Sequence, residues 1–312
     1  MSDVPAGGVI ETKGPLSIRI QSVLYQTPLA SISRALEFFD NAARVAGEAG
    51  IANQVMVAYG DCSPDRIIDG STLHSLRHRF SNLASIDCTF FDDNLGSARG
   101  HNRLLAEAAS DLVVIANPDV LAAPNLLIEL VGAWARPRAG FVEARQLPIE
   151  HPKYYHPQTG ETSWASTACA MGSTELFKQL NGFDADTFFL YCDDVDFSWR
   201  VRLAGLQVVH QPSAVVFHDK RLTSEGGWIA GAAERYYSAE AGLLLPYKYS
   251  RPDLTDKYLE IFDASEDEHL IKAAGAFRLR AETGRLPTPI DPDHIVAEFV
   301  DGGYARTRYT PR

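Results

Sequence analysis

The sequence has few cysteines, and their spacing excludes two classes of small domain. The four cysteines are far apart and include no C-x-x-C pair: Cys62, Cys88, Cys169 and Cys192. A disulfide scaffold needs more cysteines in a shorter chain, and a structural zinc site needs closely spaced ligands. The spacing therefore favours buried thiols in a reducing compartment, and we expect a cytoplasmic protein.

Long apolar runs are also absent. The most apolar segment, 112–134, is interrupted by Asn-Pro-Asp at 117–119 and by later polar residues, so it is too broken to cross a bilayer. The N-terminus lacks the basic start and the apolar stretch of a secretory signal, and we expect residues 1–15 to form a flexible tail. No transmembrane segment is expected, while peripheral association with the inner face of the cell membrane stays open.

Positive charge is scarce. The 29 Lys and Arg residues oppose 40 Asp and Glu residues, which leaves a net charge of −11, and no basic run occurs. Binding along a nucleic-acid backbone needs the opposite sign, so nucleic acid is not an expected partner. An anionic ligand must instead be met by a metal ion or by a few placed groups. With 46% hydrophobic residues the chain can build a core, which excludes intrinsic disorder.

Short apolar runs alternate with helical patterns in the first two thirds of the chain, which is typical of a mainly parallel sheet covered by helices. Strands are predicted at 17–24, 54–59, 88–91, 111–116, 141–146, 208–209 and 214–217. Helices are predicted at 31–47, 94–108, 124–134 and 193–204. The segment 148–163, rich in Pro, His and Tyr, is expected to be a long loop, and such loops are often functional.

The pattern changes near residue 222, after which it is helical without strand runs. Further helices are predicted at 231–245, 256–262, 266–283 and 294–299. We therefore expect an α/β domain over 16–222 and a helical region over 223–312. The helical region could dock a second subunit and form a homodimer, touch a membrane, or simply pack against the domain, and we favour packing.

Acidic residues stand at the ends of three apolar runs. Asp61 and Asp119 follow predicted strands, and in open α/β sheets ligands bind at the carboxyl ends of strands. Asp193, Asp194 and Asp196 open a predicted helix. Asp193 can cap this helix, and Asp196 can pair with Arg200 four residues later. These two roles account for two of the three carboxylates. The remaining carboxylate is costly unless a positive charge lies nearby.

These residues belong to a series of motifs that resembles a known family. The motifs are, in order, Asp61-Cys62-Ser63, Asn94-Leu95-Gly96 through Asn102, Asn117-Pro118-Asp119, Gly182-Phe183-Asp184, Tyr191 to Asp196 with Arg200, and His218. In this order they resemble the family 2 glycosyltransferases, and among these the bacterial rhamnosyltransferase- and galactofuranosyltransferase-like enzymes. The resemblance covers about residues 16–250. It implies a GT-A fold, a nucleotide-sugar donor, a divalent cation and inversion at the anomeric carbon.

The resemblance also implies roles for single residues. Asp194 matches the catalytic base, and Asp61 matches the acid that hydrogen-bonds the nucleobase. Asp119 and His218 match metal ligands. Carboxylate oxygens suit hard divalent cations, while an imidazole ligand shifts the preference toward Mn²⁺, with Mg²⁺ as the alternative.

Two departures weaken the match. Asn117 stands where the family has the first acid of an Asp-x-Asp motif, and Gly60 stands where the usual turn has an acid. The first departure leaves fewer anionic metal ligands, and the second puts the nucleobase contact in doubt.

Further residues complete the predicted donor and acceptor sites. The donor site is expected to include Ser63, Asn94, Gly96, Arg99, Asn102 and Asn117. Several of these lie at a loop-to-helix start, where backbone N–H groups favour phosphate, and an ordinary helix start with an exposed arginine is the alternative. The acceptor side is expected to include Asp193, Asp196 and Trp164. An aromatic residue such as Trp164 can stack on a sugar, although core packing is its commoner role.

The sequence thus predicts an inverting, divalent-metal-dependent glycosyltransferase. Its best-matching reaction moves rhamnose from dTDP-rhamnose, with a UDP-sugar as the alternative donor, to a polyprenyl-diphosphate-linked or other glycan acceptor in cell-envelope synthesis. A non-catalytic GT-A-fold protein that binds glycan or a partner is one alternative, favoured by Gly60 and Asn117. A metal-dependent phosphoesterase acting on nucleotide sugars is the other.

Overall fold

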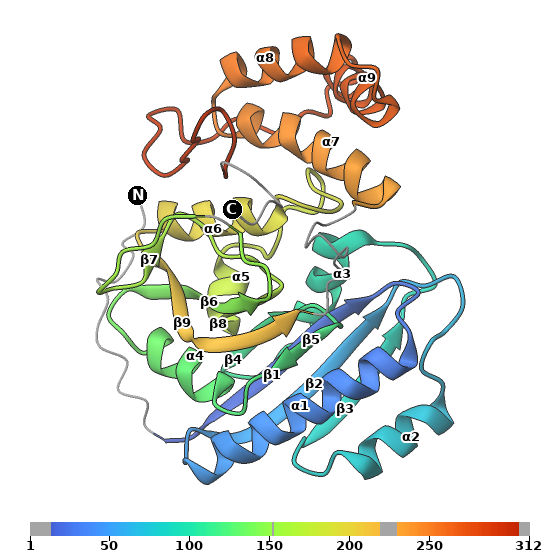
Figure 1. Ribbon diagram of the computed structural model, residues 1–312, viewed down its shortest axis with the longest axis vertical. Helices are drawn as coiled ribbons and strands as arrows, with labels where there is room; N and C mark the ends of the chain where they lie inside the picture. Colours follow the sequence, from blue (N-terminus) through green and yellow to red (C-terminus); the bar gives the residue numbers. More distant parts are fainter. Residues whose placement is uncertain (1–13, 152, 219–229, 306–312) are drawn as a thin grey trace.

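The computed structural model describes residues 14–151, 153–218 and 230–305, which form a sheet between helical layers and a further group of helices beyond it (Figure 1). The strands are β1 (Leu16–Leu24), β2 (Ala52–Asp61), β3 (Ser85–Phe90), β4 (Leu112–Ala116), β5 (Val120–Ala122), β6 (Ala139–Leu147), β7 (Glu161–Thr162), β8 (Cys169–Ser173) and β9 (Gln207–His218). The helices are α1 (Leu29–Glu48), α2 (Gly70–Arg79), α3 (Gly96–Leu105), α4 (Leu126–Trp134), α5 (Thr174–Gln179), α6 (Asp193–Leu203), α7 (Ala232–Lys248), α8 (Pro252–Asp263) and α9 (Glu268–Glu282).

One sheet contains all nine strands of the described chain. Its order is β3-β2-β1-β4-β8-β6-β9-β5, and β7 pairs with β9. Neighbouring strands are parallel from β3 through β4 and again between β6 and β9. Only β5, β7 and β8 run against the others. The prediction of an α/β protein with a mainly parallel sheet is therefore confirmed.

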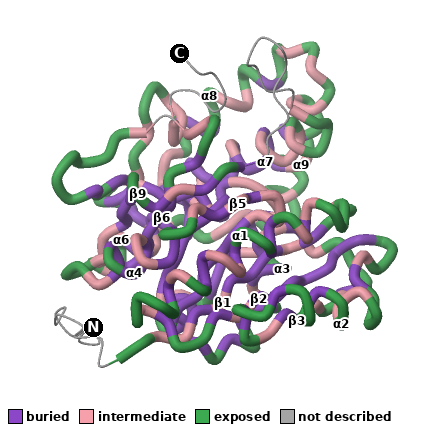
Figure 2. The backbone as a smooth tube through the Cα atoms, turned by 60° about the horizontal axis from the view of Figure 1, so that its bottom comes forward, coloured by how far each residue is buried: buried purple, intermediate pink, exposed green. Residues whose placement is uncertain are grey.

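Both faces of the sheet are covered, as its apolar strands require. In β4, Leu112 and Val114 pack into the core under α1 and α4, whereas Val113 and Ile115 pack into the core under α3, α5 and α6. Figure 2 shows the buried strands at the centre and the exposed residues along the outer segments. The carboxyl ends of the central strands stay uncovered by these layers, which leaves that edge for a site.

The C-terminal helices build a core of their own against α6. Val195 and Trp199 of α6 pack with Leu244 of α7 and Phe277 of α9, and none of these side chains is more than slightly exposed. No helix in the described residues combines the length and apolarity that crossing a bilayer requires. The domain boundary predicted near residue 222, and residues 1–13 of the predicted tail, lie outside the described residues.

Several local predictions differ from the structure. The strands predicted at 208–209 and 214–217 are one strand, β9, with an irregularity opposite Ala144 and Arg145. The helix predicted at 294–299 is wrong, because the Asp291 carboxylate binds the backbone N–H groups of the following residues 295–297 and holds them in a loop. Neither α2, whose buried residue is Leu76 alone, nor the five-residue β8 was predicted.

A turn before α6 depends on glycine. Gly182 has a left-handed backbone with φ of 64°. The Asn102 amide donates to the Phe183 carbonyl at 2.7 Å and accepts from the Phe183 N–H at 2.8 Å. A Cβ on Gly182 would lie 2.3 Å from Asn102 Oδ1, so only glycine fits beside this pair of hydrogen bonds.

Replacement of this glycine should destabilise the fold through the Asn102 contact. Gly182→Ala should cost about 1–2 kcal/mol for the left-handed backbone plus about 0.5–1.5 kcal/mol for each hydrogen bond that Asn102 loses. Gly284→Ala is the matched control, because Gly284 has a similar φ of 65° and open space around its Cβ position. Urea unfolding measures both variants, and equal losses would contradict the role given to Asn102.

Candidate functional site

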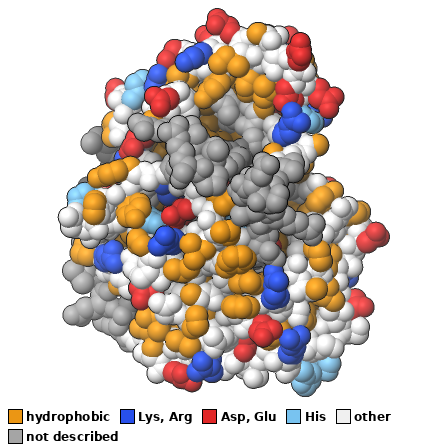
Figure 3. Space-filling model, viewed as in Figure 1, with side chains coloured by type: hydrophobic (Ala, Val, Ile, Leu, Met, Phe, Trp, Pro, Cys, Tyr) orange, Lys and Arg blue, Asp and Glu red, His pale blue; other side chains and the backbone are white. Residues whose placement is uncertain are grey.

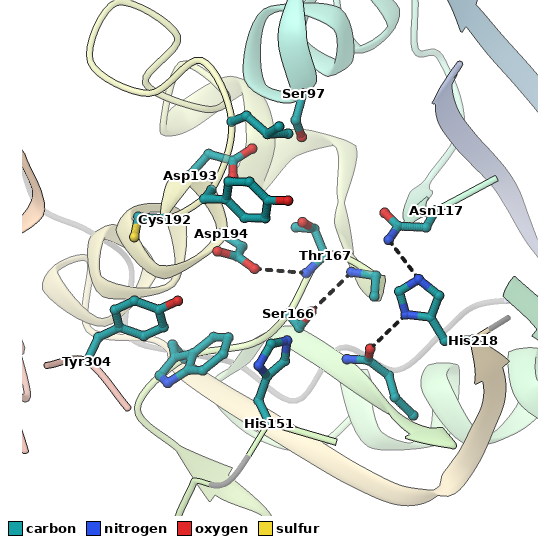
Figure 4. Close-up of a pocket in the computed structure, with 15 residues that line it drawn as sticks. Ser97, Asn117, His151, Ser166, Thr167, Cys192, Asp193, Asp194, His218 and Tyr304 are labelled. Atoms are coloured by element: carbon teal, nitrogen blue, oxygen red, sulfur yellow. Dashed lines mark hydrogen bonds between the residues drawn. The ribbon is translucent and has the colours of Figure 1, made fainter. Parts of the chain in front are cut away.

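A polar cavity of about 190 Å³ lies where β4 and β9 end and α6 begins. Its lining includes Asn117, Trp164, Asp193, Asp194, His218 and Tyr304. Figure 4 shows Asp194 on one side of this cavity and His218 with Asn117 on the other. The tertiary structure therefore brings together residues from three distant parts of the sequence, and we call this space the polar cavity.

His218 is held in one orientation by its neighbours. Gln146 Oε1 lies 3.2 Å from His218 Nδ1, and Asn117 Nδ2 lies 3.3 Å from Nε2. His218 pairs with Val120 across the β5–β9 ladder, which brings Oδ1 of the preceding Asp119 to 3.3 Å from Nε2. Donation from Nδ1 to Gln146 Oε1 leaves Nε2 as the ring nitrogen that faces Asn117 and Asp119.

Asp119 and His218 fit two ligand positions of a divalent cation whose other ligands would come from a bound substrate. Within the described ranges no three His, Cys, Asp or Glu side chains converge as a complete metal shell. Asp119 offers a carboxylate that is 38% exposed, and the buried His218 offers one nitrogen. This nitrogen and oxygen pair has an open side, where oxygens of a substrate would complete the coordination of a divalent cation.

Asp194 reaches the polar cavity because the backbone before α6 is strained. Tyr191 and Cys192 both have left-handed backbones, with φ of 69° and 56°, at a cost of about 1–3 kcal/mol each. Asp194 Oδ2 then accepts from the Thr167 N–H at 3.4 Å, and Oδ1 accepts from the Val195 N–H at 2.9 Å. This carboxylate is well placed to accept a proton from a group bound in the cavity.

The neighbouring Asp193 is buried, and its Oδ2 has no hydrogen-bond partner. Burial and the adjacent Asp194 raise the pKa of Asp193 from 3.8 to about 7, although a hydrogen bond with Ser97 acts in the opposite direction. Near neutral pH Asp193 therefore retains a proton for much of the time.

Asp196 does not reach the polar cavity. Its fully buried carboxylate accepts from Arg200 Nε at 2.8 Å and from the Tyr249 hydroxyl at 3.1 Å, and it pairs with Lys248. The predicted i,i+4 pair with Arg200 is therefore confirmed. The expected place of Asp196 on the acceptor side is not supported, because its oxygens are used to attach α6 to α7.

Asp61 and Ser63 also lie outside the polar cavity. The Asp61 carboxylate accepts from the N–H groups of Ser63 and Ile67 at 3.0 and 2.8 Å, and Ser63 Oγ accepts from the Gln26 N–H at 2.7 Å. Both side chains are buried, and they order the loop after β2. Between them, Cys62 faces a second cavity.

This second cavity, of about 230 Å³, adjoins the polar cavity and shares Ser97, Asn117 and Leu190 with it. The predicted donor residues Asn94 and Gly96 line it. Its aromatic lining consists of Tyr25, Phe189 and Tyr237, of which the last two stack with ring centroids 4.6 Å apart. We call it the aromatic cavity.

The α3 helix separates the predicted donor residues into two groups. Gly96 allows the start of α3 to approach the backbone of Phe189 closely, since a Cβ at Gly96 would lie 2.3 Å from the Phe189 carbonyl oxygen. Arg99 instead turns away and pairs with Asp186 at 2.8 Å, and Asn102 binds the Phe183 turn. Arg99 and Asn102 line neither the polar nor the aromatic cavity, so the structure does not bring them to the predicted donor site.

A buried charged group behind Trp164 was not predicted. Lys153 donates to the Trp164 carbonyl at 2.9 Å, lies 4.2 Å from its ring centroid and pairs with Glu143. Glu143 also accepts from the Ser166 N–H at 2.9 Å and lies 3.2 Å from His210 Nδ1. Burial alone would raise the pKa of Glu143, yet Lys153 and His210 lower it to about 2. Glu143, between Val142 and Ala144 in the predicted strand 141–146, was the available signal.

Comparisons with known proteins agree on the fold. No family model matches the chain. A mannosyltransferase from Pyrobaculum calidifontis, solved with GDP-Man and Mn²⁺, matches with a TM-score of 0.55 at 17% identity, over 87% of this chain and 77% of that one. GalNAc-T7, solved with UDP, GalNAc and Mn²⁺, matches with a TM-score of 0.62 at 10% identity, over 88% and 56%. The fold is therefore of the GT-A type.

Sequence relatives come from Mycobacterium tuberculosis. N-acetylglucosaminyl-diphospho-decaprenol L-rhamnosyltransferase is 28% identical over 174 residues, covering 41% of this chain and 56% of that protein. Pre-mycofactocin glycosyltransferase is 26% identical over 179 residues, covering 51% and 36%. The chain thus matches little more than half the length of the first relative. Over these partial matches the chain is similar to glycosyltransferases, one of which is a rhamnosyltransferase.

The raised pKa of Asp193 predicts a pH-dependent stability. Because this pKa is higher in the folded than in the unfolded protein, the folded state binds the extra proton, and the contribution of Asp193 to stability falls as pH rises from 3.8 to about 7. Asp193→Asn should remove this loss and leave the variant more stable than the wild type at pH 8. Urea unfolding across this pH range measures the effect.

The control for this prediction is Asp186→Asn, because the Asp186 carboxylate is 93% exposed. It should leave the pH slope of stability as in the wild type. Parallel slopes for the wild type and Asp193→Asn would contradict the assignment.

Proposed function

We propose that this chain is an inverting, metal-dependent glycosyltransferase that uses Asp194 as the general base. The observation that carries the proposal is the convergence of Asp194, Asn117 and His218 on the polar cavity (Figure 4). The GT-A fold and the glycosyltransferase relatives support the same reaction class. A second cavity next to the first supports a substrate with two unlike parts, such as a nucleotide joined to a sugar.

The arrangement suits displacement at a sugar carbon. An acceptor hydroxyl beside Asp194 attacks the anomeric carbon, the bond from that carbon to the diphosphate oxygen breaks, and Asp194 takes the hydroxyl proton. General-base assistance of this kind contributes about 10²–10⁴ in rate. Because base and diphosphate lie on opposite sides of the carbon, the configuration inverts. Single-base chemistry of this kind needs no second carboxylate as an acid, unlike glycoside hydrolysis.

The diphosphate is assigned to the side of the cavity formed by Asn117 and His218. Asp119 does not line the cavity itself, but its Oδ1 lies 3.3 Å from His218 Nε2. A divalent cation held by Asp119 and His218 would neutralise the charge that develops on the departing diphosphate. Gln146 keeps the His218 nitrogen available, and Asn117 lies at the border with the aromatic cavity. The nucleoside then extends into the aromatic cavity, where Tyr25 and Tyr237 offer rings for contact with the base.

The proposed donor sugar is rhamnose carried on dTDP, and the proposed acceptor is a lipid-linked or polysaccharide glycan of the cell envelope. The named activity of the rhamnosyltransferase relative supports both assignments. A protein that keeps the fold but only binds glycan remains the second candidate, because Asn117 takes the place of an acid near the proposed cation. Nucleotide binding that depends on Mn²⁺ distinguishes the two.

Asp194→Asn should abolish transfer while donor binding stays nearly intact, because the amide cannot accept the hydroxyl proton. Asp253→Asn is the control, since Asp253 also lies in the first turn of a helix but far in the chain from the cavity lining. Rates of rhamnose transfer from dTDP-rhamnose and calorimetric donor affinity measure the two effects. Wild-type turnover in Asp194→Asn would remove this residue from the base role.

Chelation should stop transfer, and added Mn²⁺ should restore it. Gln146→Ala should weaken Mn²⁺-dependent binding of dTDP by about 10–100-fold, because neighbours that orient a metal-binding histidine usually contribute that much. Gln179→Ala, at an exposed position on α5, is the control. Full activity of the wild type in EDTA would refute the roles given to Asp119 and His218.

A further inference from the structure

The C-terminal helices enclose an apolar cavity that the proposed reaction has not used. It has a volume of about 210 Å³ and lies between α7, α8 and the segment 299–305. Its lining includes Leu245, Pro246, Tyr258, Phe262, Phe299 and Tyr304, and it contains no charged side chain. Figure 3 shows apolar side chains gathered over this upper part of the molecule. We call it the C-terminal cavity.

One side chain borders both this cavity and the polar cavity. Tyr304 lines both, and its ring lies edge-on to Trp164 with centroids 5.3 Å apart. The neighbouring backbone is held by Tyr258, whose hydroxyl donates to the Gly302 carbonyl at 2.9 Å. A molecule that occupied both spaces would pass Tyr304, with an apolar part on one side and a polar part on the side of Asp194.

The lining of the C-terminal cavity favours the apolar part of such a molecule. The C-terminal cavity offers aliphatic and aromatic surface, and its one buried hydroxyl without a hydrogen-bond partner is Ser238 Oγ. An anion or a sugar would lose water there without gaining charged partners. A hydrocarbon chain would gain from burial, by about 0.8 kcal/mol for each methylene group, or about fourfold in affinity.

The surface next to this cavity is also apolar. Ile261 and Val300 are 49% and 39% exposed, and each is next in sequence to a residue of the cavity lining. Ile295, in the loop that precedes the lining segment, is 72% exposed. Exposed apolar side chains in the segments that build the cavity suit a partner that brings its own apolar surface.

We propose that the C-terminal cavity binds the hydrocarbon chain of an amphiphilic acceptor, whose polar head group enters the polar cavity beside Asp194. This inference rests on the proposed glycosyl transfer, and it assigns the acceptor to the lipid-linked class. The C-terminal helices then contribute part of the acceptor site.

Gly242 provides a way to fill the cavity without disturbing the fold. It lies on α7 in the lining, and a Cβ there would meet no atom within 4 Å. A leucine side chain at this position would therefore extend into the open space. Gly275 on α9 is the matched control, because it also has no atom within 4 Å of its Cβ position and it does not line the cavity.

The experiment measures binding of butyl, octyl and dodecyl phosphate to the full chain by calorimetry, below their micelle concentrations. In the wild type and in Gly275→Leu, affinity should rise by about fourfold per methylene until the cavity is full. In Gly242→Leu the rise should be largely lost, with dTDP binding in Mn²⁺ unchanged. Equal affinity for the three probes in the wild type, or an unchanged rise in Gly242→Leu, would overturn the inference.

Measurements on the wild type and on Asp194→Asn distinguish failure of this inference from failure of the proposed function. Chain-length-dependent binding needs no turnover, so it should persist in Asp194→Asn. A rise with chain length together with no transfer activity in the wild type would overturn the proposed function alone. Transfer to an acceptor without any effect of chain length on binding would overturn the cavity assignment alone.

Discussion

The buried carboxylate of Asp196 is the interaction on which the arrangement of the site depends. It binds Arg200 within α6, and it binds Lys248 and Tyr249 at the end of α7. Arg200 also donates to the carbonyls of Leu180 and Gly182 in the turn before α6. Removing one partner of such a buried group typically costs about 3–5 kcal/mol, because a charge is left without compensation. One side chain thus positions the helix that presents Asp194 and attaches the C-terminal helices to it.

The site contains residues that face the cavities and other residues that orient those side chains. Asp194 and His218 face the polar cavity, while Thr167 and Gln146 orient them. The buried group formed by Lys153, Glu143 and His210 holds the chain around Trp164. The functional surface is therefore polar and open, and it rests on charges that are buried and paired.

The C-terminal helices connect the fold to the proposed chemistry. Their core is continuous with α6 through Trp199, and α7 supplies Tyr237 to the aromatic cavity. The segment after α9 supplies Tyr304 to the polar cavity. The C-terminal region, for which packing was the favoured role among several, thus contributes residues to the linings of all three cavities described above.

The sequence by itself determined the class of fold, the mainly parallel sheet and most of the long helices, because apolar periodicity records which face of each element is buried. It also indicated Asp119, Asp194 and His218, because short motifs carry residue types in a fixed order. Only the tertiary structure decided that Asp196, Arg99 and Asn102 bind other parts of the chain instead of the cavities. It also decided that Gln146 and Lys153 support the site. Side-chain direction and long-range partners depend on packing between distant segments, and local patterns do not encode that packing.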